Sequence, residues 1–115
     1  MTFYFCHNGT IDDPLLAGYR GKTDSLRYFR YLLDHFDDHD PEGSLSRATG
    51  GIERYTGANA FLITDGLLGV ISRYRKFPRY YTMYRAGGIF SSEPLPEIAA
   101  DWRPLKNGTV LCISQ

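Results

Sequence analysis

The chain has 115 residues and a mass of 13.1 kDa, so we expect residues 1–115 to form a single domain around one hydrophobic core. Apolar residues make up 43% and charged residues 23%, which favours a folded chain over a disordered one. Thirteen basic residues balance thirteen acidic ones, which argues against a general binder of polyanions. No apolar stretch reaches the length of a membrane span, and the first residues lack the features of a secretory signal. With two cysteines, no disulfide framework is expected, and a cytoplasmic location is the simplest prediction.

The first half of the chain is predicted to contain one strand and two helices. Residues 2–7 are aromatic and β-prone, and they stop at the turn-forming pair Asn8-Gly9. A helix should begin near Thr23, because apolar residues then recur at spacings of three and four. A second, weaker helix is predicted from about Glu42 to Tyr55, broken or ended by Gly50-Gly51.

From residue 59 onward the pattern indicates strands. Asp65-Gly66 and Asn107-Gly108 are favoured two-residue turns, and each predicts a hairpin. The strands expected here are 59–64, 67–73, 79–85, 89–92, 105–106 and 109–114. A strand, two helices and then this series of short strands predict an α+β domain with a mainly antiparallel sheet.

Two short motifs could carry chemistry. At the end of the first strand, Asn8 and Gly9 could present a side-chain amide and a backbone N–H side by side, as an oxyanion hole requires. An ordinary turn explains the same pair. Asp24, at the start of the first helix, could bind the ammonium of an amino acid, or it could simply complement the helix dipole.

The order of motifs along the chain resembles that of the class II glutamine amidotransferases, which belong to the N-terminal-nucleophile hydrolases. The resemblance covers nearly the whole chain and implies part of an αββα sandwich. It rests on the following segments: His7-Asn8-Gly9-Thr10-Ile11, Thr23-Asp24-Ser25, Asn59 to Gly66, Tyr80 to Arg85, Ser91 to Leu95, and Trp102 to Gly108.

This resemblance implies glutamine as the ligand and hydrolysis of its amide, with transfer of ammonia, as the activity. In the family, an N-terminal cysteine attacks the amide and its own α-amino group serves as the base. The oxyanion-hole roles would fall on Asn8 and Gly9, and Asp24 would hold the α-amino group of glutamine. No cofactor and no metal are implied.

The chain departs from the family pattern where the nucleophile is expected. The chain starts about where the His-Asn-Gly segment starts, and Thr2 follows the initial Met instead of a cysteine. An extended Thr2 would lie about 16 Å from the oxyanion donors. Cys6 is nearer, but neighbouring side chains of a strand point to opposite faces, which disfavours a pair with His7. No nucleophile is therefore identified. At the helix start, Leu26 replaces the usual Glu, so the reciprocal capping box is lost.

These departures predict that the chain is inactive alone and that its exposed sheet face is covered. A homodimer or a separate chain supplying the N-terminal half would cover such a face. A non-catalytic structural or interaction module and a shortened gene product remain alternatives.

Two other functional hypotheses each concern a single segment. His35 and His39 are four residues apart and could share a helix face as metal ligands, although a solvated helix end explains them equally. Residues 73–81 mix cations with aromatics, as single-stranded nucleic-acid binders do. Because the net charge is zero, no nucleic-acid partner is expected.

Overall fold

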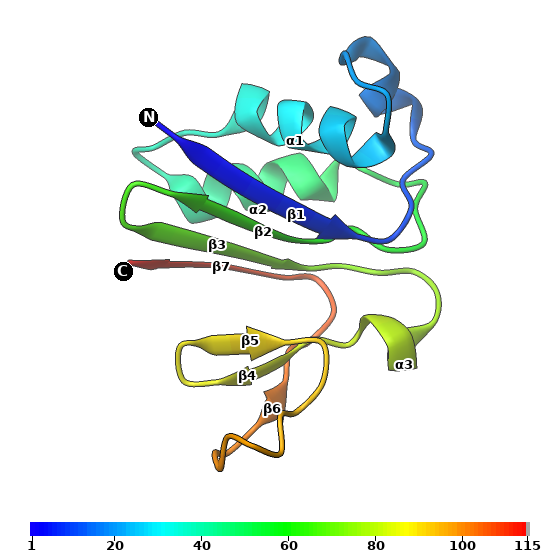
Figure 1. Cartoon of the computed structure of the whole chain (residues 1–115). Helices are drawn as coiled ribbons and strands as arrows, with labels where there is room; N and C mark the ends of the chain where they lie inside the picture. The colour runs from blue at the N-terminus through cyan, green and yellow to red at the C-terminus, as the bar shows by residue number, and fades with distance from the viewer. Residues whose placement is uncertain (115) are drawn as a thin grey trace.

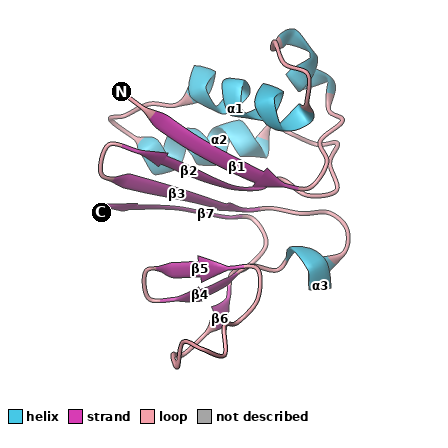
Figure 2. Cartoon of the chain, in the orientation of Figure 1, coloured by secondary structure: helices cyan, strands magenta, loops and turns pink. Residues whose placement is uncertain are grey.

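The computed structural model describes residues 1–114, which form two antiparallel sheets and three α-helices (Figures 1 and 2). The main sheet has the strand order β1 (Phe3–Asn8), β2 (Asn59–Thr64), β3 (Leu67–Ser72) and β7 (Thr109–Ser114). Helices α1 (Asp24–His35) and α2 (Pro41–Gly50) lie on one face of this sheet, as Figure 1 shows. The α+β class and the antiparallel pairing are confirmed.

Capping side chains set the starts of both long helices. The hydroxyl of Thr23 accepts a hydrogen bond from a first-turn N–H of α1 at 3.1 Å, as the sequence predicted. The Asp40 carboxylate caps α2, with Pro41 at its first position. This helix ends at Gly50, at the glycine pair where the sequence predicted a break or an end, and does not continue to Tyr55. The segment expected as a loop before α1 contains a short 3₁₀ helix, η1 (Pro14–Gly18).

Aromatic packing joins β1 to α1. The Phe5 ring meets Tyr28 edge-on at 5.6 Å and stacks on Phe29 at 4.9 Å. Tyr28 is fully buried, and its hydroxyl donates to the carbonyl of Ala58 at 3.0 Å, just before β2. Burial of such large rings contributes strongly to stability, and the buried hydroxyl keeps a hydrogen-bond partner. The helix is thereby held against the end of the sheet where β1 finishes.

The second sheet is small and has the order β5 (Ile89–Ser91), β4 (Tyr84–Ala86) and β6 (Arg103–Pro104). The predicted strand 79–85 is wrong in its first half, where a short helix, α3 (Pro78–Tyr81), forms instead. Pro78 has the backbone φ that a first helical turn needs and no N–H to leave unpaired. The β-propensity of the tyrosines in this segment is overridden.

The hairpin predicted around Asn107-Gly108 is also wrong. Residues 105–106 form no strand, and the N–H of Leu105 donates to Met83 O at 2.7 Å. The last strand, β7, pairs with β3 instead, with Leu67 opposite Ser114. A favourable turn sequence promotes a hairpin only when the preceding residues are free to pair, and β6 pairs with β4.

The face of the main sheet that points away from the helices is only partly covered. The small sheet lies on this side (Figure 1), where Phe90 approaches Phe61 at 6.4 Å between ring centroids. Farther along, Tyr4 of β1 and Ile63 of β2 are opposite each other and are 66% and 46% exposed. No helix within residues 1–114 is long and apolar enough to cross a membrane.

Candidate functional site

The candidate site lies at the end of β1, where Asn8 projects away from the helices. Alternate β1 residues are exposed, and Asn8 shares this outward side with Cys6. Within residues 1–114 the Asn8 side-chain amide makes no hydrogen bond, so its N–H groups are free to donate to a ligand. The sequence prediction required a free amide at this position.

Gly9 follows Asn8 in a backbone conformation that favours glycine, with φ at 123°. A Cβ at this position would lie 2.2 Å from the carbonyl oxygen of Gly57. Gly57 is confined in turn, because a Cβ there would lie 2.5 Å from the Tyr81 ring. The strand end is therefore packed directly against the chain that enters β2, and neither glycine has room for a side chain.

His7 ties three segments together on the opposite side of β1. Its Nδ1 lies 2.8 Å from Ser25 Oγ at the start of α1, and its Nε2 lies 3.1 Å from Gly57 O. Since a carbonyl only accepts, Nε2 carries the proton and Nδ1 accepts from the serine hydroxyl. The His7 pKa is lowered by burial, against opposing effects of the Gly57 hydrogen bond and the Asp24 charge. His7 thus acts as a neutral positioning residue for the strand end.

Thermal stability is expected to fall on acidification because of His7. The folded-state pKa lies below the ordinary 6.5, so the unfolded chain takes up the proton first as the pH drops. This contribution to stability is complete above pH 6.5 and is lost as the pH falls through the folded pKa. Melting temperatures of the wild type and His7→Gln across this range test it, with His39→Gln as the exposed control. The melting temperature of His7→Gln should depend less on pH than that of the wild type. Equal pH dependence of the melting temperature in all three proteins would contradict the expectation.

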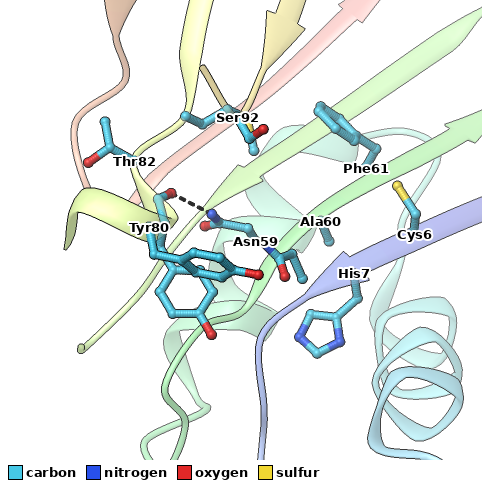
Figure 3. Close-up of a pocket in the computed structure, with 11 residues that line it drawn as sticks. Cys6, His7, Asn59, Ala60, Phe61, Tyr80, Thr82 and Ser92 are labelled. Atoms are coloured by element: carbon cyan, nitrogen blue, oxygen red, sulfur yellow. Dashed lines mark hydrogen bonds between the residues drawn. The ribbon is translucent and has the colours of Figure 1, made fainter. Parts of the chain in front are cut away.

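A cavity of about 150 Å³ opens beside Asn8, between the main sheet and the segment that carries α3 (Figure 3). Its lining comes from β1, β2, α3 and the loops flanking the small sheet: Cys6, His7, Asn8, Asn59, Ala60, Phe61, Tyr80, Tyr81, Thr82, Met83 and Ser92. A more polar hollow of about 340 Å³ adjoins it and shares Asn8, Tyr80 and Ser92. The free amide of Asn8 thus lies where the two spaces meet.

Asp24 is placed near this site but does not line the cavity. One of its carboxylate oxygens accepts the backbone N–H of Ile11 at 2.8 Å, which ties the chain after Gly9 to the start of α1. The structure therefore brings Asp24 and the β1 end together through His7 and Ile11, not through a shared cavity. Its predicted role in binding an amino group stays a prediction.

Neither cysteine has the environment of an activated nucleophile. Figure 3 shows Cys6 and His7 on opposite sides of β1, as strand geometry predicted, so the imidazole cannot serve as its base. For Cys112, burial and the nearby Glu42 carboxylate raise the thiol pKa to about 11, so the thiol stays protonated at neutral pH.

Asn59 is the site residue to which the sequence gave no role. It is buried, and its amide nitrogen donates to Tyr81 O at 2.6 Å while its amide oxygen accepts from the Arg73 N–H at 2.8 Å. These bonds fasten α3 and the end of β3 to β2, and Figure 3 draws the first of them as a dashed line. The signal in the sequence was a polar residue that opens a largely apolar strand.

The two histidines considered as metal ligands do not share a helix face. His35 ends α1, where its Nδ1 lies 2.9 Å from Tyr31 O, whereas His39 lies in the following turn and is 94% exposed. Across residues 1–114, no three His, Cys, Asp or Glu side chains are grouped in a way that could hold a metal ion.

The arrangement of two helices on an antiparallel sheet, with a second small sheet, can be compared with known proteins. No family model and no curated protein sequence matches the chain. Among solved structures, it is similar to a glutamine aminotransferase class-II domain protein from Silicibacter pomeroyi, with a TM-score of 0.66 and 24% sequence identity. The match covers 98% of this chain and 64% of that one. The chain therefore has the fold of a class-II glutamine amidotransferase domain, over somewhat less than two thirds of the length of its neighbour.

Proposed function

We propose that this chain is a glutamine-binding domain of the class-II glutamine amidotransferase type, inactive alone and dependent on a nucleophile from another polypeptide segment. The observation that carries the proposal is the free Asn8 amide beside Gly9, at the point where two hollows meet. In this proposal the Asn8 amide and the Gly9 N–H donate to the oxyanion that forms when the glutamine amide is attacked, and removing one such donor typically costs about 10²–10³ in rate.

The need for a further segment is supported by chemistry and by size. The pKa of Cys112 is raised, and Cys6 lies on the opposite side of β1 from His7, which therefore cannot serve as its base. The cavity beside Asn8, at about 150 Å³, is smaller than the ~300–1,000 Å³ usual for ligand sites. A segment packed over the outward face would deepen it and could bring the attacking thiol.

Asp24 is proposed to hold the α-amino group of glutamine through its carboxylate. One oxygen is engaged with Ile11, and the other makes no hydrogen bond within residues 1–114. The negative charge also acts on His7, which places it close to the end of β1. A carboxylate and an ammonium form one of the stronger hydrogen bonds available to proteins.

Calorimetry with glutamine tests this assignment. Asp24→Asn removes the charge but keeps an oxygen that can accept the Ile11 N–H, so we expect a folded protein that binds glutamine at least about tenfold more weakly. Asp65→Asn, in the β2–β3 turn, is the matched control and should bind as the wild type does. Equal heats from Asp24→Asn and wild type would remove Asp24 from the site. No binding by the wild type, or ammonia release by this chain alone, would contradict the proposal.

A second candidate is a non-catalytic interaction module, and the exposed pair Tyr4 and Ile63 favours it. We propose that a second copy or a separate chain covers this outward face and the free edge of β1. Light scattering over a concentration series distinguishes the two partners. A dimer supports self-association, whereas a monomer at every concentration excludes the homodimer.

A further inference from the structure

Two arginines converge on a single ring at the end of β3. The Arg73 and Arg75 guanidinium carbons lie 5.3 and 5.1 Å from the Tyr55 ring centroid. Together with Tyr74, Asn107 and Gly108 they line an open hollow of about 430 Å³, which we call the arginine bowl. In Figure 1 the chain leaving β3 and the chain entering β7 lie at the same end of the main sheet.

The backbone of the arginine bowl is fixed on both sides. Asn107 accepts the Tyr74 N–H at 2.9 Å and donates to its carbonyl at 2.7 Å. On the other side, the N–H of Arg75 donates to Thr56 O at 3.0 Å, and the Arg73 carbonyl accepts from Ala58 at 2.8 Å. The two arginines therefore project from a preorganised segment, and little backbone freedom is left to lose when a ligand binds.

The positive charge of the bowl is not neutralised by the protein. Within residues 1–114 neither Arg73 nor Arg75 forms an ion pair. The buried Nε of Arg73 has no hydrogen-bond partner, and its side chain donates only one long bond, 3.4 Å to Ile52 O. The local sequence agrees, since residues 66–92 contain five cations and no carboxylate. Two adjacent guanidiniums with unused donors match an anion that accepts several hydrogen bonds.

We propose that the arginine bowl binds the phosphoryl groups of a small phosphorylated ligand. Guanidinium groups bind phosphate through two parallel hydrogen bonds, and stacking on Tyr55 holds both groups in position. This site is separate from the one beside Asn8, since none of the residues that line the bowl lines either of those two hollows.

A single-stranded nucleic acid fits the bowl less well. Base stacking needs open ring faces, but Tyr55 carries the guanidiniums and Tyr74 stacks on Tyr81 at 6.3 Å. The exposed aromatics of this segment, Phe77 and Tyr80, do not line the bowl. Helix α3 begins directly after Phe77, so residues 79–81 do not form the extended strand that was predicted there.

Calorimetric titration of the whole chain with inorganic pyrophosphate at low ionic strength tests the proposal. We expect saturable binding of one pyrophosphate, weakened at least about tenfold in Arg75→Gln and in Arg73→Gln. Arg85→Gln is the matched control, because Arg85 also stacks on an aromatic ring, 5.3 Å from the centre of Phe90, and does not line the bowl. Its affinity should equal that of the wild type.

Further titrations separate the alternatives. Citrate in place of pyrophosphate distinguishes a phosphoryl site from a general carboxylate site, and equal affinities would overturn the phosphoryl assignment. If the half-buried Arg73 variant fails to fold, the exposed Arg75 variant still decides the question. No binding by the wild type, or undiminished binding by Arg75→Gln, would overturn the proposal. Binding of a single-stranded oligonucleotide is measured as well. If Arg79→Gln and Arg75→Gln weaken that binding equally, the surface is a nucleic-acid site instead.

Discussion

Gly9→Ala is expected to lower the free energy of unfolding by at least about 3 kcal/mol, because a positive-φ conformation and a backbone clash act together. The new Cβ would lie 2.2 Å from Gly57 O and 2.4 Å from the Gly57 carbonyl carbon, at a φ of 123°. Backbone atoms cannot turn aside as a flexible side chain can. The end of β1 must then separate from the chain entering β2, and the cavity beside Asn8 must distort.

Urea denaturation measures this loss, and Gly50→Ala provides the control. Gly50 ends α2 and has no positive φ, and a Cβ added to it would meet no neighbouring group within 4 Å. Alanine there should leave stability unchanged or raise it by up to about 1 kcal/mol, since alanine is the better helix former. If Gly9→Ala were as stable as Gly50→Ala, the close contact between Gly9 and Gly57 would not exist in solution.

Asn59→Ala is expected to destabilise the protein by about 2–4 kcal/mol. The substitution leaves the Tyr81 carbonyl and the Arg73 N–H without their partner at a buried position, and each unpaired buried group costs about 1–3 kcal/mol. Helix α3 loses its link to β2, so the wall of the cavity that contains Tyr80 and Tyr81 should loosen as well. If the proposed glutamine site is correct, its affinity should weaken in proportion to this loss of order.

Asn107 offers a matched comparison for Asn59. It also bridges a backbone N–H and a carbonyl, both belonging to Tyr74, but it is exposed. Water can replace its bonds, so Asn107→Ala should cost about 1 kcal/mol or less. Chemical denaturation of the two variants side by side measures the difference. Equal losses would show that burial does not set the cost of removing the Asn59 amide.

Local sequence signals correctly predicted the start of helix α1 and the β2–β3 hairpin. The Thr23 cap, the apolar spacing after it and the Asp65-Gly66 turn are each properties of a few neighbouring residues, and all three appear as expected. The failures lie at 79–85, where helix α3 replaces the first half of the expected strand, and at 105–114, where β7 pairs with β3 and not with residues 105–106. Propensity could decide neither case, because tertiary contacts override it in the first segment and either pairing satisfies the same backbone groups in the second.

The residues of the candidate sites also fall into two groups, those indicated by local sequence and those shown only by tertiary contacts. The place of Asn8 and Gly9 at a strand end could be predicted because a turn pair is a local signal, whereas their role as oxyanion donors stays a prediction. Gly57, Asn59 and the pair of arginines on Tyr55 could not be predicted, because contacts between segments more than ten residues apart give them their roles.

By itself the sequence determined the α+β class, the cap of α1, the β2–β3 hairpin and the place of Asn8 at the end of a strand. Only the tertiary structure decided that β7 pairs with β3, that Asp24 holds Ile11 and lies outside the cavity, and that two cations share one aromatic ring. The physical reason is the distance along the sequence between the residues that interact. Turns and caps are satisfied within a few residues, whereas strand partners and buried hydrogen bonds depend on which distant segment reaches the same space.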